Sequence, residues 1–303
     1  MTSTPNADPG YGIRPPDYRL PDATRLGAVR LQVSDLERSL GFYESILGLR
    51  VLRRDASSAT LGPMGDETPL VRLHEWRGAR PVPRRGRHGL FHYAILLPDR
   101  AALGRLIGHL AEARVHVGAS DHLVSEALYL SDPDGLGIEV YADRPRHAWR
   151  WADRELAMST LPLDTEDLVR AADGARWSGA PAGTTMGHVH LHVGDLAGAS
   201  AFYHNALGFD RVVWRYPGAL FLSAGGYHHH LGVNTWAGAS ATAPAEDEAR
   251  LIEWELLLPS DDDVDAARAS LAGAKHAAAE QDDGSVTARD PWDTAVRLRS
   301  GQA

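Results

Sequence analysis

The sequence of 303 residues contains no cysteine, which excludes disulfides, thiolate nucleophiles and thiolate metal ligands. A metal site would therefore have to use histidine, carboxylate or tyrosine side chains. Lysine is almost absent as well, because Lys275 is the single one among many arginines. The chain also lacks an apolar run of about 20 residues, as a transmembrane helix needs, and a basic-then-apolar leader. These absences predict a protein with no membrane partner and, by default, a cytoplasmic location.

The charge balance argues against a nucleic-acid partner. The net charge is −9, and the arginine-rich stretch from Arg77 to Arg87 is short and broken by proline. The apolar content of 44% and the charged content of 23% are ordinary for a globular protein. At this length the chain can form two average domains with a sizeable core.

The most informative stretch present is Gly187–Leu196, which places His188, His190 and His192 two residues apart. Alternate side chains of a strand project to the same face of a sheet. A strand here would therefore direct three imidazoles into one cavity.

This stretch belongs to an internal repeat, since residues 27–78 recur at 187–238 with one constant offset. Identical residues occupy twelve positions of the two copies: Gly27, Val29, Leu31, Val33, Asp35, Leu36, Phe42, Tyr43, Leu47, Gly48, Trp76 and Gly78, matched by their counterparts in 187–238. Related units lie at 89–145 and, in degraded form, near the C-terminus. The sequence therefore predicts four βαβββ modules at 26–78, 89–145, 186–238 and 250–300, called modules one to four.

The fold class predicted is α+β, with two domains of paired modules at 26–145 and 186–300. Residues 1–25 are rich in proline and predict an extended arm, and the segment 146–185 predicts a linker between the halves. Ser34–Glu37 has capping-box spacing, so a helix should begin there and end before Gly48. Further helices are expected at 101–113 and 263–274.

Alignment of the modules places one set of polar residues at equivalent positions. The first strands contribute Ala28, His92, His188 and Glu253, and the last strands contribute Arg72, Glu139, Gly232 and Arg297. Modules two and three together supply His92, Glu139 and His188, whereas modules one and four cannot supply a similar set. The pattern predicts one metal site per chain.

Two histidines and one carboxylate, with coordination positions left open, form the ligand set of non-heme Fe(II) oxygenases. The open positions matter because substrate and O₂ can bind side by side on one ion. Taken singly, a strand histidine is more often a core or surface residue, and a glutamate between Ile138 and Val140 is often solvent-facing. Their joint occurrence at homologous positions of two repeats favours the site.

The segments Phe91–Ile95, Asp132–Tyr141 and Gly187–Val193, together with the four-module plan, resemble the vicinal oxygen chelate (glyoxalase/bleomycin resistance/dioxygenase) superfamily. The closest branch is that of the bacterial catechol 2,3-dioxygenase-like extradiol enzymes, and the resemblance extends from Leu26 to about Arg299. It implies cupped mixed sheets and an Fe(II) site, with Mn(II) as the alternative metal. It also implies O₂-dependent cleavage of a catechol- or hydroquinone-type aromatic ring.

The resemblance implies three further catalytic residues. Tyr129, ten residues before Glu139, corresponds to a tyrosine that hydrogen-bonds a metal-bound substrate oxygen. His122 resembles a family histidine shortly before that tyrosine, although the gap is slightly short. His229 is the best match to a histidine that shuttles protons, a task that suits an imidazole.

The sequence gives weaker support for a role of the other histidines in the site. Because consecutive residues of a strand face opposite ways, at least one of His228, His229 and His230 should point away from the site. His190 and His192 either line the cup or serve packing. His74 and Glu75 could serve as ligands if modules one and two paired, but surface positions are expected.

One departure from the main extradiol pattern concerns the pairing of the modules. In the best-known members the ligands come from modules three and four, whereas here they come from modules two and three. Modules two and three must then share a cup, either within one chain or between the chains of a homo-oligomer.

Two other functions remain open at this stage. The first is a glyoxalase-type metal-dependent lyase or isomerase, which usually has four protein ligands. The second is a non-catalytic protein that sequesters a small aromatic compound without a metal.

Overall fold

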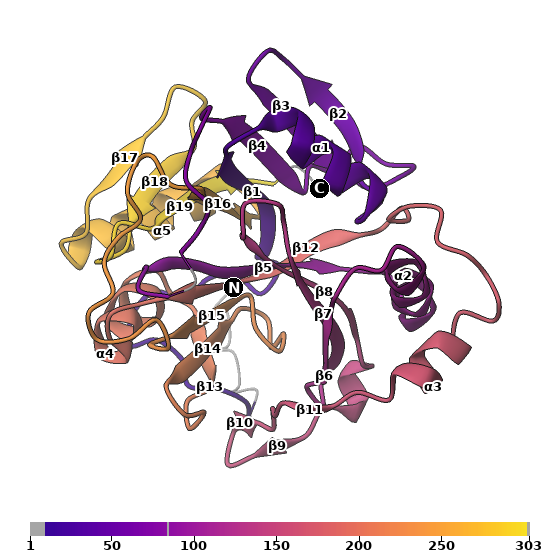
Figure 1. Ribbon diagram of the computed structural model, residues 1–303. Coiled ribbons are helices and arrows are strands. Elements are labelled where there is room, and N and C mark those ends of the chain that lie inside the picture. The colour runs from indigo at the N-terminus through magenta and orange to yellow at the C-terminus, as the bar shows by residue number, and fades with distance from the viewer. Residues whose placement is uncertain (1–9, 84, 302–303) are drawn as a thin grey trace.

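The computed structural model describes residues 10–83 and 85–301, and its elements follow the four modules (Figure 1). Module one contains β1 (Arg25–Val33), α1 (Leu36–Ser45), β2 (Arg50–Arg54), β3 (Ser58–Gly62) and β4 (Val71–Glu75). Module two contains β5 (Gly89–Leu96), α2 (Arg100–Glu112), β6 (Gly118–Asp121), β7 (Ser125–Ser131) and β8 (Gly137–Asp143). Module three contains β12 (Thr185–His192), α4 (Leu196–Ala199), β13 (Asp210–Val213), β14 (Ala219–Ser223) and β15 (Leu231–Asn234). Module four contains β16 (Arg250–Leu258), α5 (Asp261–Gly273), β17 (Ala278–Glu280), β18 (Val286–Arg289) and β19 (Ala295–Ser300).

The modules form two mixed sheets, in agreement with the predicted α+β class. Modules two and three form a nine-stranded sheet in the order β11-β6-β7-β8-β5-β12-β15-β14-β13, in which β11 (Leu161–Pro162) comes from the predicted linker. Modules one and four form an eight-stranded sheet in the order β17-β18-β19-β16-β1-β4-β3-β2. Figure 1 shows the indigo and yellow modules one and four side by side above the middle of the chain. One continuous core of buried apolar side chains extends through both sheets.

The sheets combine modules across the two halves of the sequence. The first strands of the modules pair in antiparallel fashion, β5 with β12 and β1 with β16. Modules two and three therefore share a cup within one chain. The predicted domains imply that module one pairs with two and module three with four. The structure instead pairs module one with four and module two with three, because the first strand of each module forms its antiparallel pair with a strand from the other half of the chain.

Consecutive modules are instead connected by a repeated contact between the sheets. In the first half, the hydroxyl of Tyr43 on α1 lies 3.4 Å from Asp132 Oδ2 in the turn before β8. In the second half, the hydroxyl of Tyr203 donates to Asp290 Oδ2 at 2.8 Å. Tyr43 and Tyr203 are matched residues of the sequence repeat, so the repeat is preserved in tertiary contacts as well.

The helices lie close to their predicted positions, but the first is capped differently. Asp35, rather than Ser34, is the N-cap of α1, and its side chain accepts from the backbone N–H of Arg38. Ser34 bonds instead to the carboxylate of Asp134. In module three the helix continues beyond α4 as a π-helix at Ser200–Ala206.

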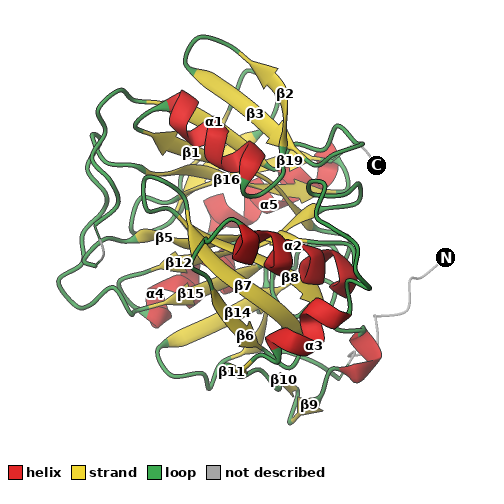
Figure 2. Cartoon of the chain, turned by 45° about the vertical axis from the view of Figure 1, so that its right-hand side comes forward, coloured by secondary structure: helices red, strands yellow, loops and turns green. Residues whose placement is uncertain are grey.

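The predicted arm and linker both pack on the modules. Residues 1–9 of the arm lie outside the described residues, but Ile13 pairs with Arg211 of β13, and Leu20 is buried. The linker contains a 3₁₀ turn (Arg146–Ala148), β9 (Trp151–Ala152), β10 (Glu155–Leu156), β11 and α3 (Thr165–Arg170). Figure 2 shows α3 beside α2, which it contacts closely at Gly104. In the described part of the chain, no helix is long and apolar enough to cross a membrane.

Candidate metal centre

Three adjacent strands in the middle of the nine-stranded sheet carry the predicted ligands. His92 lies on β5, Glu139 on β8 and His188 on β12. Ala94 on β5 is the register partner of both Glu139 on β8 and His188 on β12. Because His92 is two residues from Ala94, all three side chains project from the same face of the sheet. Buried apolar residues flank the ligands on each strand and fix the strands against the core: Tyr93 on β5, Ile138 and Val140 on β8, and Val189 on β12.

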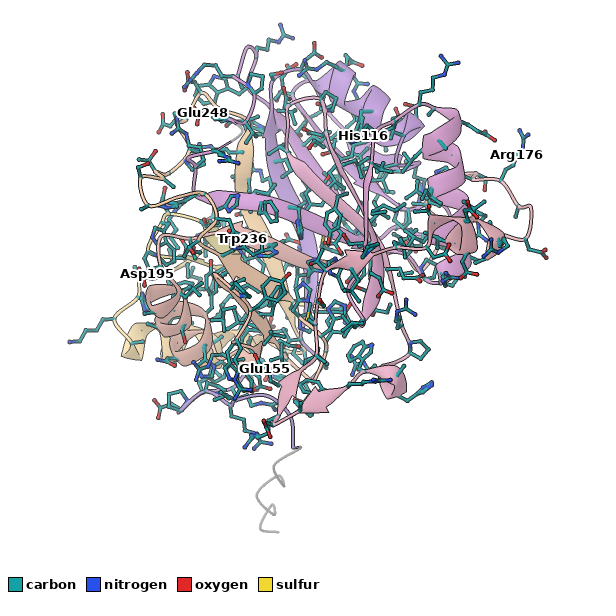
Figure 3. The ribbon with its side chains drawn as sticks, turned by 60° about the horizontal axis from the view of Figure 1, so that its bottom comes forward. His116, Glu155, Arg176, Asp195, Trp236 and Glu248 are labelled. Carbon is teal, nitrogen blue, oxygen red and sulfur yellow. The ribbon has the colours of Figure 1, made fainter. Side chains whose placement is uncertain are left out.

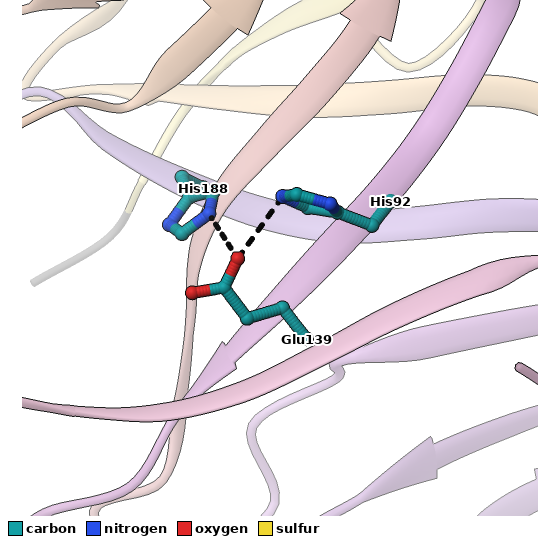
Figure 4. Close-up of side chains that lie close together, drawn as sticks. All are labelled: His92, Glu139 and His188. Carbon is teal, nitrogen blue, oxygen red and sulfur yellow. Dashed lines mark hydrogen bonds and ion pairs between the residues drawn. The ribbon is translucent and has the colours of Figure 1, made fainter. Parts of the chain in front are cut away.

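The three side chains converge on one point (Figure 4). Glu139 Oε2 lies 3.0 Å from His92 Nε2 and 3.2 Å from His188 Nε2. One donor atom from each residue lies within 4.8 Å of the others, and all three residues are buried. The structure therefore brings together two imidazoles and one carboxylate at a spacing that suits a single cation.

The electrostatics of the cluster also fit a cation. Burial pushes the pKa of Glu139 upward, but its contacts with His188 and His92 outweigh burial and hold that pKa well below its ordinary value. Burial lowers the pKa of His188 to about 4, so this imidazole is neutral at pH 7 and has a lone pair for a metal. His92 Nε2 is buried and, despite its contact with Glu139, lacks a partner in hydrogen-bonding geometry. A buried carboxylate beside two imidazoles is a donor set that a divalent metal ion satisfies.

A cavity of about 290 Å³ opens onto the three donors. Aromatic and apolar walls come from Phe91, Met158, Tyr216, Phe221 and Trp236 (Trp236 is labelled in Figure 3). The remaining lining residues are hydroxyl-bearing or carry imidazoles: Ser120, His122, Ser125, Tyr129, Ser159, Thr160, His190 and His229. Within the described part of the chain, Glu139 is the only carboxylate that lines it, and no arginine or lysine does. A larger cavity of about 1040 Å³ adjoins it and shares Phe91, His92 and Tyr129.

Tyr129 and His122 form one hydrogen-bonded unit at the cavity wall. Tyr129 on β7 is the register partner of Glu139 on β8, so both face the cup. His122 Nε2 lies 2.6 Å from the Tyr129 hydroxyl, and its Nδ1 lies 2.8 Å from the carbonyl oxygen of Ser159. A carbonyl only accepts, so Nδ1 carries the proton and Nε2 accepts from Tyr129. Burial raises the pKa of Tyr129 well above its ordinary value, so the hydroxyl stays protonated.

The three consecutive histidines lie in the loop before β15, so strand alternation does not govern their directions. His229 lines the cavity, and its ring centroid is 4.1 Å from that of His188. Burial lowers the pKa of His229 well below its ordinary value. His228 is buried behind His229, and His230 contacts Ser223 and the backbone N–H of Ala224.

The remaining histidine-bearing positions have separate roles. His190 lines the cavity and leaves its buried Nε2 without a hydrogen-bond partner. His192 Nδ1 lies 2.7 Å from Asn234 Oδ1 and the residue borders the larger cavity. Glu75 accepts from the backbone N–H of Leu36 at the start of α1, and His74 is half-buried. Glu75 thus caps a helix.

The cup of modules one and four contains ion pairs in place of the donor set. Glu253 and Arg297 occupy the register positions of His92 and Glu139. Glu253 Oε1 lies 3.4 Å from Arg297 and 3.7 Å from Arg30. The neighbouring Glu255 pairs with Arg72. In this cup the cationic partners of the buried glutamates are therefore arginines.

Sequence reasoning missed several of the cavity walls. Met158, Ser159 and Thr160 belong to the predicted linker, which has no counterpart in the repeat and gave no signal. Tyr216 and Phe221 belong to module three but have no identical partner in module one. Trp236 does have one, Trp76, and Phe91 begins the segment that carries the family resemblance, so two of the wall residues had a sequence signal.

Comparison with known proteins gives a consistent result. The sequence profile of the Glyoxalase/Bleomycin resistance protein/Dioxygenase superfamily matches residues 25–140 and 185–283. A catechol-2,3-dioxygenase of Bacillus subtilis (strain 168) is 44% identical over 272 residues, which are 88% of this chain and 94% of that protein.

The solved structures of similar fold include a dioxygenase and a glyoxalase. A provisionally assigned dioxygenase from Bacillus subtilis subsp. subtilis str. 168 has a TM-score of 0.65 at 14% identity, covering 94% of this chain and 87% of that one. Glyoxalase I from Zea mays has a TM-score of 0.54 at 18% identity and covers 92% of each chain. At such low identity these two likenesses concern the fold alone.

Proposed function

Because the chain belongs to the glyoxalase/bleomycin resistance protein/dioxygenase superfamily, we propose that it is a metal-dependent extradiol dioxygenase. Its substrate is a catechol- or hydroquinone-type aromatic, and its second substrate is O₂. The observation that carries the proposal is the buried cluster of His92, Glu139 and His188 at the floor of an aromatic-walled cavity. The 44% identity to a catechol-2,3-dioxygenase supports the same reaction class.

The metal would be held by His92 Nε2, His188 Nε2 and the Glu139 carboxylate. Fe(II) is the proposed ion and Mn(II) the alternative, since imidazole and carboxylate ligands suit both. When bound, such an ion supplies open positions for substrate oxygens and for O₂ and conducts electrons between them.

The protein side chains bind the substrate and manage its protons. The aromatic ring packs between Phe91, Phe221 and Trp236 at the mouth of the cup. The Tyr129 hydroxyl donates its proton to His122, so its oxygen accepts a hydrogen bond from a substrate hydroxyl. His229 takes a proton from the substrate hydroxyl and returns it as the ring opens, a role that suits its position beside His188.

The composition of the cavity favours substrates without a charged substituent. No arginine or lysine lines it among the described residues, so a carboxylate substituent would be buried without a cationic partner. Its volume of about 290 Å³ suits one aromatic ring with a small apolar group.

The experiment that tests the proposal measures oxygen consumption. Protein loaded anaerobically with Fe(II) should consume O₂ on addition of catechol, alkylcatechols or hydroquinones, and His92→Ala should abolish the uptake. Catechols with a carboxylate substituent should be poorer substrates. Absence of uptake across a broad panel, with metal bound, would defeat the proposal.

The two other functions have distinct signatures. A glyoxalase-type lyase or isomerase usually has a fourth protein ligand, and Glu139 is the only carboxylate that lines the described cavity. Activity with Ni(II) or Zn(II) in the absence of O₂ would identify it. Tight binding of an aromatic compound by metal-free protein would identify a sequestering protein.

A further inference from the structure

His228 is a buried histidine next to the site that does not line the cavity. Its side chain has no measurable exposure, and its ring packs against the rings of Tyr227 and Trp149, with centroid distances of 4.1 Å and 5.4 Å. On one side its Nδ1 lies 2.7 Å from Nδ1 of His229. On the other side its Nε2 lies 2.9 Å from Oδ1 of Asp143. The three residues form a continuous chain from a carboxylate to the cavity wall.

The direction of each hydrogen bond in this chain follows from the chemistry of its ends. A carboxylate accepts only, so His228 Nε2 carries a proton and donates to Asp143. In the neutral imidazole the other nitrogen, His228 Nδ1, is then a bare acceptor. The facing Nδ1 of His229 must therefore be the donor.

We propose that His228 and Asp143 are positioning residues that hold His229 in its Nδ1–H tautomer and leave its Nε2 as a bare acceptor for the substrate proton. The effect resembles the orientation of a metal-ligating or catalytic histidine by a carboxylate behind it. Here the orientation passes through one additional imidazole. The catalytic part of this inference rests on the proposed function, whereas the tautomer of His229 does not.

A second set of contacts holds Asp143 in place. The Tyr227 hydroxyl donates to Asp143 Oδ1 at 3.3 Å, so it accepts from the Tyr141 hydroxyl at 2.6 Å. Both tyrosine rings are buried. The carboxylate is thus presented to His228 by fixed side chains, although about a quarter of its own surface is exposed (27%).

Three variants separate positioning from packing. His228→Phe retains a ring but neither hydrogen bond, and it should lower kcat about 10- to 100-fold with KM and metal content unchanged. His228→Gln offers both an acceptor and a donor and should recover most of that loss. His230→Phe replaces the neighbouring buried histidine, which lies outside the chain of hydrogen bonds, and should leave kcat unchanged.

The tautomer itself is measured by ¹⁵N–¹H correlation spectra of the histidine rings in metal-free protein. Wild-type His229 should show the Nδ1–H pattern, and Asp143→Ala should change it. A wild-type His229 protonated on Nε2, or a His228→Phe enzyme with wild-type kcat, would overturn the inference. If the protein cleaves no aromatic ring, the spectra still test the tautomer, so failure of the two proposals can be told apart.

Discussion

At the scale of single residues, Glu139 and Glu253 form a matched pair of buried glutamates with different partners. Glu139 faces two imidazoles, whereas Glu253 faces Arg297 and Arg30. Glu139→Gln should weaken metal binding by more than the 10- to 100-fold that a change behind the ligands typically costs. Added Mn(II) should raise the Tm of the wild type but not of this variant, because binding to the folded state stabilises it.

Glu253→Gln is the control for that prediction. It disrupts an ion pair in the cup of modules one and four and should reduce the free energy of unfolding by roughly 1–3 kcal/mol. Metal affinity, measured by calorimetry, should be that of the wild type. Equal losses of metal affinity in both variants would contradict the assignment of the site to modules two and three.

Asp132 gives a pH-dependent prediction, since burial chiefly raises its pKa from 3.8 to about 7. Below about pH 4 this carboxyl is protonated in both the folded and the unfolded chain, and its contribution to stability is fully present. As the pH rises toward 7 the unfolded chain releases the proton first, so stability falls. Asp132→Asn keeps the acceptor used by the N–H groups of Asp134 and Leu136 but cannot titrate.

The stability of Asp132→Asn relative to the wild type should therefore increase between pH 4 and 8, by up to roughly 4 kcal/mol. Urea denaturation of both proteins at pH 4 and at pH 8 measures this difference. A difference that does not change with pH would show that the carboxyl titrates normally.

The positions of His92, Glu139 and His188 could be predicted from the sequence because strand spacing and the repeat constrain them together. Their role as ligands stays a prediction. His228 could not be predicted as a partner of His229, because both lie in a loop and the alternation of strand residues says nothing about a loop. Met158 and Thr160 could not be predicted as cavity residues either, because the segment that carries them has no copy elsewhere in the chain.

At the scale of single elements, β12 packs closely against the side chain of Tyr141 at Gly187. A Cβ atom added there would lie 1.8 Å from the Tyr141 hydroxyl, which hydrogen-bonds Tyr227. Gly187→Ala should therefore displace Tyr141 and reduce the free energy of unfolding by about 1–3 kcal/mol. Thermal denaturation measures the loss.

Gly108→Ala on α2 is the matched control, because no atom lies within 4 Å of an added Cβ at that position. It should stabilise the protein by up to about 1 kcal/mol, as alanine favours a helix over glycine. A Gly187→Ala variant as stable as the wild type would mean that Tyr141 can move without reducing the free energy of unfolding.

Helix positions could be inferred from polar caps and apolar periodicity, since both are local properties. The predicted helix at 101–113 corresponds to α2 at Arg100–Glu112, and that at 263–274 to α5 at Asp261–Gly273. The structure of the linker could not be inferred, because β9, β10 and β11 are two residues long and exist only through their partners. The same applies to the π-helix after α4, whose hydrogen bonds depend on tertiary packing.

At the scale of the whole molecule, the association of the modules is a property that the repeat alone leaves open. Four similar modules can pair as neighbours or across the halves, and both arrangements bury similar apolar strands. The ligand set indicated the second arrangement, because His92 and Glu139 lie in module two and His188 in module three. The antiparallel pairing of β5 with β12 forms this second arrangement within one chain.

This arrangement makes each half of the chain dependent on the other. A break after Gly174, in an exposed part of the segment between the halves, gives fragments 1–174 and 175–303. The first contains His92 and Glu139 and the second contains His188, so neither should bind the metal with the affinity of the intact chain. Co-expression should restore a complex with one site, because both sheets require strands from both fragments. Calorimetric titration with Mn(II) measures the sites, and full affinity in fragment 1–174 alone would show that His188 is not a ligand.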